Sequence, residues 1–187
     1  MAGLRTFISI PLPADVREAI GEFAALLRPY AGPARWEDPR KLHLTLKFLG
    51  ETGEGLLGEI LRAMRAAAAG AVPFTLTIGG FGAFPSLARP RVLWIGCDDP
   101  GGTLLKIQGG LERELRALGF AEEERAFHPH VTIARSRDVG APTHLTSLPK
   151  SVTFDPRHTL VTEIFLMKSV LQPAGSEYTV IGSIRLS

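Results

Sequence analysis

Two short segments of the chain have nearly the same sequence, and they constrain its fold more than any other feature. The first reads His-Leu-Thr-Leu-Lys-Phe from His43, and the second reads His-Val-Thr-Ile-Ala-Arg from His130. In an extended strand successive side chains point to opposite faces, so the histidine and threonine of each segment share one face. Each segment therefore predicts a strand that packs aliphatic side chains into a core and presents an imidazole and a hydroxyl on its open face.

A third His-x-Thr triplet, at His144, has a different setting. Prolines flank it and no alternation of apolar and polar residues surrounds it, so it is interpreted as a loop and as a chance match. Only the strand-borne triplets at His43 and His130 are candidates for a site.

The pattern of apolar residues predicts an alternation of strands and helices. Helical spacing from Asp15 to Leu27, from Leu57 to Ala68 and from Leu104 to Leu118 predicts three amphipathic helices. Strands are expected at 4–10, 42–49, 74–78, 91–97, 130–135, 159–168 and 177–186. The strands at 74–78 and 91–97 are expected to form a hairpin.

The two motifs are 130 − 43 = 87 residues apart, close to half of the 187 residues. This spacing suggests a duplicated lobe, and no linker-like segment separates the halves. We expect an α+β fold, a single two-lobed domain over residues 1–187. It would have two antiparallel sheets around a central cleft and helices on the outside, and one motif strand of each lobe would line the cleft.

Two histidines that face each other across a cleft suit general acid-base catalysis, in which one group gives a proton and another accepts one. Imidazole has a pKa near 6.5, so the acid and the base form are both accessible at neutral pH. The hydroxyls of Thr45 and Thr132 can donate hydrogen bonds to the oxygens of an anionic group such as a phosphate, and a cation can offset the charge of those oxygens. Lys47, on the face of His43, and Arg135 are the candidate cations. Arg135 has the wrong parity for a flat strand, so its role requires a bend.

Composition limits the other classes of function. A net charge of +2 is too mild for a protein that scans DNA, although it permits an anionic substrate. The single cysteine, Cys97, follows a run of apolar residues and is expected to be a buried, inert thiol. The sequence has no signal peptide and no membrane-spanning run, so a cytoplasmic protein that does not contact a membrane is expected.

The wider sequence resembles the two-histidine phosphoesterase superfamily. It is most similar to the RNA 2′,3′-cyclic 3′-phosphodiesterases of bacteria and archaea, formerly called 2′-5′ RNA ligases. The order and spacing of several segments carry this resemblance, which covers nearly the whole chain. These segments are 5–10, Trp36, 43–50, 80–85, 91–96, 129–135, 168–169 and Tyr178.

The resemblance implies a bilobal fold and hydrolysis of RNA 2′,3′-cyclic phosphate ends to 2′-phosphates by cleavage of the 3′ ester. It implies that His43 donates a proton to the leaving oxygen and that His130 accepts one from water, although the residues alone leave these roles interchangeable. No metal and no cofactor is expected. The aromatic residues Trp36, Phe81 and Phe84 are candidates for contacts with base or ribose.

Several alternatives stay open. The protein could be a non-catalytic module that binds RNA ends, or a metal-dependent phosphoesterase that uses His128 beside the two motif histidines. Neither is favoured, because a binding module does not need two matched histidines and no carboxylates cluster near the motifs. For His128 a packing or orienting role is favoured. The substrate could be an RNA end derived from tRNA or a cyclic nucleotide, and 2′-5′ ligation is the reverse reaction. A monomer is expected.

Overall fold

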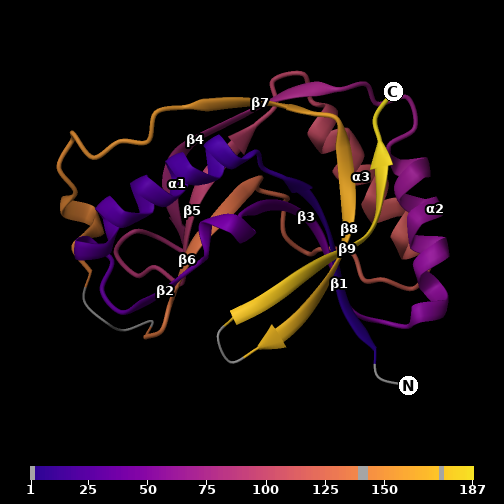
Figure 1. The fold of residues 1–187 in the computed structure, drawn as a ribbon, viewed down its shortest axis with the longest axis horizontal. Helices are drawn as coiled ribbons and strands as arrows, with labels where there is room; N and C mark the ends of the chain where they lie inside the picture. The colour runs from indigo at the N-terminus through magenta and orange to yellow at the C-terminus, as the bar shows by residue number, and fades with distance from the viewer. Residues whose placement is uncertain (1–2, 139–142, 173–174) are drawn as a thin grey trace.

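The computed structural model describes residues 3–138, 143–172 and 175–187, which contain helices and strands in alternation (Figure 1). The strands are β1 (Leu4–Pro11), β2 (Ala34–Trp36), β3 (His43–Thr52), β4 (Phe74–Phe84), β5 (Val92–Asp98), β6 (His130–Ser136), β7 (Arg157–Val161), β8 (Glu163–Gln172) and β9 (Gly175–Arg185). The α-helices are α1 (Ala14–Leu27), α2 (Leu57–Ala67) and α3 (Thr103–Arg116), and the 3-10 helices are η1 (Arg28–Tyr30), η2 (Pro39–Lys41), η3 (Glu54–Leu56) and η4 (Leu145–Ser147). None of the helices in these ranges has the length and apolar character needed to cross a membrane.

All strand pairs in the described ranges are antiparallel, and they form one nine-stranded sheet whose two halves meet at one point. In the first lobe the order is β3-β1-β8-β9, and in the second it is β6-β5-β4-β7, with β2 also paired to β6. The two motif strands join these halves through one residue pair, Leu44 opposite Val131. The two-lobed antiparallel fold predicted from the sequence is therefore confirmed, and its strands form one continuous curled path.

The helices lie on the outside of this path (Figure 1). Helices α2 and α3 pack against each other, and α2 also contacts β9 in the first lobe. Helix α1 lies beside β4 and β5 of the second lobe, where the ring of Phe23 is 5.8 Å from that of Phe81. The face of the first-lobe sheet that α2 and α3 leave uncovered is therefore available for a site.

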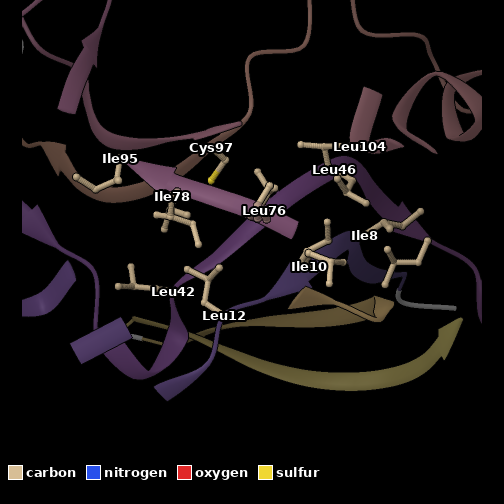
Figure 2. Packing of buried hydrophobic residues seen from close by; sticks show 14 of the residues in the cluster. Ile8, Ile10, Leu12, Leu42, Leu46, Leu76, Ile78, Ile95, Cys97 and Leu104 are labelled. Carbon is tan, nitrogen blue, oxygen red and sulfur yellow. The ribbon is translucent and has the colours of Figure 1, made fainter. Parts of the chain in front are cut away.

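Helical periodicity correctly predicted which side chains of α1 are buried in the core. In α1 the five buried side chains are those at the predicted apolar positions, Val16, Ile20, Phe23, Ala24 and Leu27. Figure 2 shows side chains of β1, β3, β4 and β5 gathered in one cluster. Cys97 belongs to this cluster, and burial raises the pKa of its thiol to about 12, which confirms the inert thiol expected from the sequence.

Each motif strand contains a bulge directly after its threonine. In β3, Thr45 lies opposite Ser9 and Lys47 lies opposite Ile8, so Leu46 is one extra residue. In β6, Thr132 and Ala134 lie opposite the adjacent residues Trp94 and Leu93, so Ile133 is the extra residue. A bulge reverses the alternation of side chains beyond it. The two strands consequently have the same burial pattern over their first six residues.

One predicted strand is wrong in extent. The segment 159–168 is two strands, β7 and β8, which pair with β4 and β1 in different lobes. No glycine or proline marks the break at Thr162, so the local sequence carried no turn signal. Strand β2 was not predicted, because three residues are too short for a periodic pattern.

Candidate active site

The two motif histidines meet where the lobes join. In an antiparallel pair with Leu44 opposite Val131, His43 comes next to Thr132 and Thr45 comes next to His130. All four side chains are half-buried and lie on the face opposite the buried Leu44 and Val131. The structure thus brings both predicted histidines and both predicted threonines to one place.

Both imidazoles are held in the same way. The Nδ1 atom of His43 is 2.7 Å from the backbone carbonyl oxygen of Lys41, and Nδ1 of His130 is 2.6 Å from that of His128. A carbonyl oxygen only accepts hydrogen bonds, so Nδ1 carries the proton and donates it in both rings. In the neutral form each Nε2 is therefore unprotonated and available as a base, and in the charged form it is an acid.

The protein environment favours the neutral form of both rings. Burial lowers the pKa of His43 and of His130, while the hydrogen bonds to the two carbonyls act in the opposite direction. The positive charge of Arg135 further lowers the pKa of both histidines. The charge of Arg135 thus acts on both imidazoles of the site.

Arg135 reaches the face of His130 because of the bulge in β6. Beyond Ile133 the alternation is reversed, so Arg135 turns to the face of His130 and is exposed. The bend in β6 that Arg135 needs in order to share the face of His130 is therefore present. Its Nε is 3.7 Å from a carboxylate oxygen of Glu37, the residue after β2. The equivalent position in β3 holds Phe48, which is 58% exposed, so this motif face has a cation in one lobe and an aromatic ring in the other.

The same bulge contradicts the prediction for Lys47. Its side chain turns into the protein, where only 1% is exposed, and Nζ lies 2.6 Å from a carboxylate oxygen of Glu112. Nζ also donates to the backbone carbonyl of Ala121 at 2.8 Å. Lys47 is thus part of a buried ion pair and does not bind phosphate in the cleft.

Only one of the three aromatic candidates lies beside a motif histidine. The ring of Phe84 is 5.2 Å from that of His130, edge to face. Phe81 packs on Phe23 of α1, and Trp36 packs against the core with the guanidinium of Arg28 5.4 Å from its ring. Neither ring has a recorded contact with a motif histidine, and contact of Phe81 and Trp36 with base or ribose stays a prediction.

Other aromatic side chains lie beside His43 and His128. Phe7 and Tyr178 lie 4.9 and 5.3 Å from the ring of His43. Trp94 lies 4.8 Å from the ring of His128, whose carbonyl orients His130, so the packing and orienting role favoured for His128 is confirmed. Burial raises the pKa of Tyr178, and the carboxylate of Glu37, the ion-pair partner of Arg135, raises it further.

Sequence reasoning did not select Phe7, Trp94 or Glu37 as parts of the site. Phe7 and Trp94 lie on β1 and β5, the strands that pair with the motif strands. Neither residue belongs to a His-x-Thr motif, so the motifs alone did not indicate them. A signal for both rings existed, since the segments 5–10 and 91–96 are among those that carry the family resemblance. The triplet at His144 is not in a strand, because His144 caps the 3-10 helix η4 and Leu145 and Thr146 lie in it, which agrees with its interpretation as a chance match.

Within the described ranges, no three His, Cys, Asp or Glu side chains come together as a set of metal ligands. A pocket of about 440 Å³ adjoins His43 and Tyr178. A second cavity, of about 300 Å³, lies between α2 and α3 and touches no motif residue. At the junction of the motif strands the described residues offer two imidazoles, two hydroxyls and one guanidinium.

The fold and this pair of imidazoles define a phosphoesterase of the two-histidine class. The model of the family described as LigT like Phosphoesterase matches the chain twice, at residues 10–94 and 95–178. The chain belongs to this family. Each match contains one of the two His-x-Thr strands.

Curated relatives and solved structures agree with this assignment. The RNA 2′,3′-cyclic phosphodiesterase of Methanothermobacter thermautotrophicus is 32% identical, and the alignment covers 98% of this chain and 99% of the relative. The protein of the same name from Thermotoga maritima is 33% identical, with 95% and 93% covered. A Thermus thermophilus structure has a TM-score of 0.78 at 31% identity, with 97% of both chains covered. Escherichia coli LigT complexed with 3′-AMP has a TM-score of 0.74 at 30% identity, with 99% of both chains covered.

Proposed function

We propose that this protein is an RNA 2′,3′-cyclic phosphodiesterase that hydrolyses the cyclic phosphate to a 2′-phosphate by general acid-base catalysis. The observation that carries the proposal is the matched pair of Nδ1 hydrogen bonds, which gives both imidazoles a free Nε2 on the same face. The names of the full-length relatives support the substrate class. Binding of an RNA end alone would not require two imidazoles in matched tautomers.

The reaction needs one neutral and one protonated histidine. In the assignment that the family resemblance implies, Nε2 of neutral His130 takes a proton from water as the water oxygen attacks phosphorus. The bond between phosphorus and the 3′ oxygen breaks, and protonated His43 gives its Nε2 proton to that oxygen. The products are a 3′ hydroxyl and a 2′-phosphate, and the two histidines have exchanged protonation states. Bound anionic phosphate favours the charged imidazole, which offsets the effect of burial.

Charge that builds on the phosphate needs hydrogen-bond donors. Thr45 and Thr132 flank the histidines of the opposite strands, where their hydroxyls can donate to the non-bridging oxygens. Arg135 supplies a positive charge at the same face, and Glu37 limits its freedom to turn away. These three donors come from both lobes, so the proposed phosphate site spans the junction between them.

For the physiological setting we propose a cytoplasmic monomer that acts on RNA ends, including those derived from tRNA, or on cyclic nucleotides. The +2 net charge and the mixed character of the cleft suit a small anionic target more than a long duplex. The complex of Escherichia coli LigT with 3′-AMP supports a nucleotide as the ligand of this chain.

The test is hydrolysis of a short RNA that ends in a 2′,3′-cyclic phosphate, with chromatographic identification of the monophosphate formed. His43→Ala and His130→Ala should each reduce kcat by about 10²–10⁴, the usual contribution of one proton-transferring residue. His144→Ala is the matched control, because this exposed histidine has the same triplet without a strand, and its kcat should stay unchanged.

Circular dichroism and thermal melting establish that each variant is folded. A folded His43→Ala protein with near-normal kcat would contradict the proposal, and so would a 3′-phosphate as the main product of the wild type.

A further inference from the structure

The pocket beside His43 has an equivalent position in the second lobe. A side chain of the protein occupies that second position. The motif strands define equivalent positions in the neighbouring strands, because Ser9 lies opposite Thr45 and Trp94 lies opposite Thr132. The next residues follow the same register, with Ile10 and Ile95 opposite the residue between His and Thr in each motif. Ser9 and Trp94 are therefore related by the internal duplication.

In the second lobe the indole of Trp94 occupies the face of the sheet next to the motif histidine. A Cβ atom on Gly82 would collide with this indole, so the glycine leaves room for the ring to lie flat on β4. The ring also lies 5.2 Å from Phe84 and 6.3 Å from His130. The equivalent place is thus filled by a flat bicyclic ring of the protein itself.

In the first lobe the equivalent residue is Ser9, whose side chain is far smaller than an indole. Ser9 lines the pocket of about 440 Å³ that reaches His43 and Tyr178. The volume is within the range of small-molecule sites. Its walls combine apolar side chains from β8, β9 and the segment after β1 with cations at its edge. The apolar residues are Leu12, Phe165, Met167 and Val180, and the cations are Arg17, Arg40 and Lys41.

One polar group in this wall has no partner in the protein. The Nη1 of Arg17 donates to the backbone carbonyl of Arg40 at 2.7 Å, whereas its Nε is buried without a hydrogen-bond partner among the described residues. A buried donor without an acceptor is costly, and a bound group with acceptor atoms would satisfy it. Purine bases carry such acceptors on a flat bicyclic ring of about the size of an indole.

We propose that this first-lobe pocket binds the purine base of the nucleotide whose cyclic phosphate lies between the histidines. The inference rests on the proposed phosphodiesterase function and deepens it. The base takes the place that Trp94 takes in the other lobe, so only the first lobe can accept a base. The substrate is thereby oriented in one direction across a site whose catalytic residues are nearly symmetric.

The experiment compares two substrates, adenosine 2′,3′-cyclic phosphate and methyl riboside 2′,3′-cyclic phosphate, which lacks the base. In the wild type kcat/KM should be about tenfold higher or more for adenosine, since one stacked base contributes about 1–3 kcal/mol. Ser9→Trp copies the second lobe and should raise KM for the adenosine substrate to the level of the base-free one. Turnover of the base-free substrate should persist.

Ser9 is only 2% exposed, so a second variant guards against misfolding. Val180→Trp fills the pocket from β9, where Val180 is 51% exposed, and should have the same selective effect. Val170→Trp is the matched control, because Val170 is 38% exposed on β8 and does not line the pocket. It should leave the preference for adenosine intact.

The outcomes separate the two proposals. If the wild type hydrolyses neither substrate, the proposed function fails. If the wild type hydrolyses both equally well, or if folded Val180→Trp keeps the full preference for adenosine, the base pocket is refuted while the function stands.

Discussion

Replacing Lys47 by methionine should lower stability and leave catalysis intact. The substitution keeps most of the side-chain volume but removes an ammonium group 2.6 Å from Glu112 and 2.8 Å from the carbonyl of Ala121. Removing one partner of a buried ion pair typically costs about 3–5 kcal/mol, because the remaining charge stays buried. For a chain of this size each kcal/mol shifts Tm by about 2–4 °C, so Tm should fall by roughly 6–20 °C.

The assay combines thermal unfolding with kcat/KM for cyclic-phosphate RNA, measured well below Tm. The double variant Lys47→Met, Glu112→Leu removes both charges and should regain part of the lost Tm. Arg135→Met is the comparison, since this exposed cation should affect kcat/KM far more than Tm. A Lys47→Met protein with unchanged Tm and greatly reduced kcat/KM would refute the structural role and restore Lys47 as a phosphate ligand.

Three further predictions concern the cleft. Because burial lowers the pKa of both histidines, kcat/KM should peak below pH 6.5 and fall as the pH rises to 8; a profile that climbs through this range contradicts an essential imidazolium. Arg135→Gln should reduce kcat about 10²–10³-fold and move the descending limb of kcat/KM to higher pH, since the guanidinium lowers the pKa of both imidazoles. Turnover should survive EDTA because imidazoles transfer the protons, and loss that Mn²⁺ restores would favour a metal-dependent reaction.

Periodic features were predictable from the sequence because they repeat locally. The buried face of α1 follows from a spacing of 3.6 residues, and the shared face of His43 and Thr45 follows from a spacing of two. Those signals need no knowledge of neighbouring strands. They were sufficient to locate both histidines and both threonines.

The features that the sequence could not predict depend on contacts between distant segments. The bulge at Leu46 exists only relative to β1, and it decides that Lys47 is buried and Phe48 exposed. The partner of Lys47, Glu112, is 65 residues away along the chain. The tautomers of the histidines depend on backbone carbonyls, whose direction is fixed by the fold and not by residue type.

Cutting the chain in two would separate strands that belong to the same lobe. The first lobe combines β1 and β3 with β8 and β9, while the second combines β4 and β5 with β6 and β7. A cut in the loop between β5 and α3 would therefore give two fragments that each hold parts of both lobes. Neither fragment could complete a lobe alone, so we expect function only when both are present and associate. Each half of the chain thus supplies strands to both lobes.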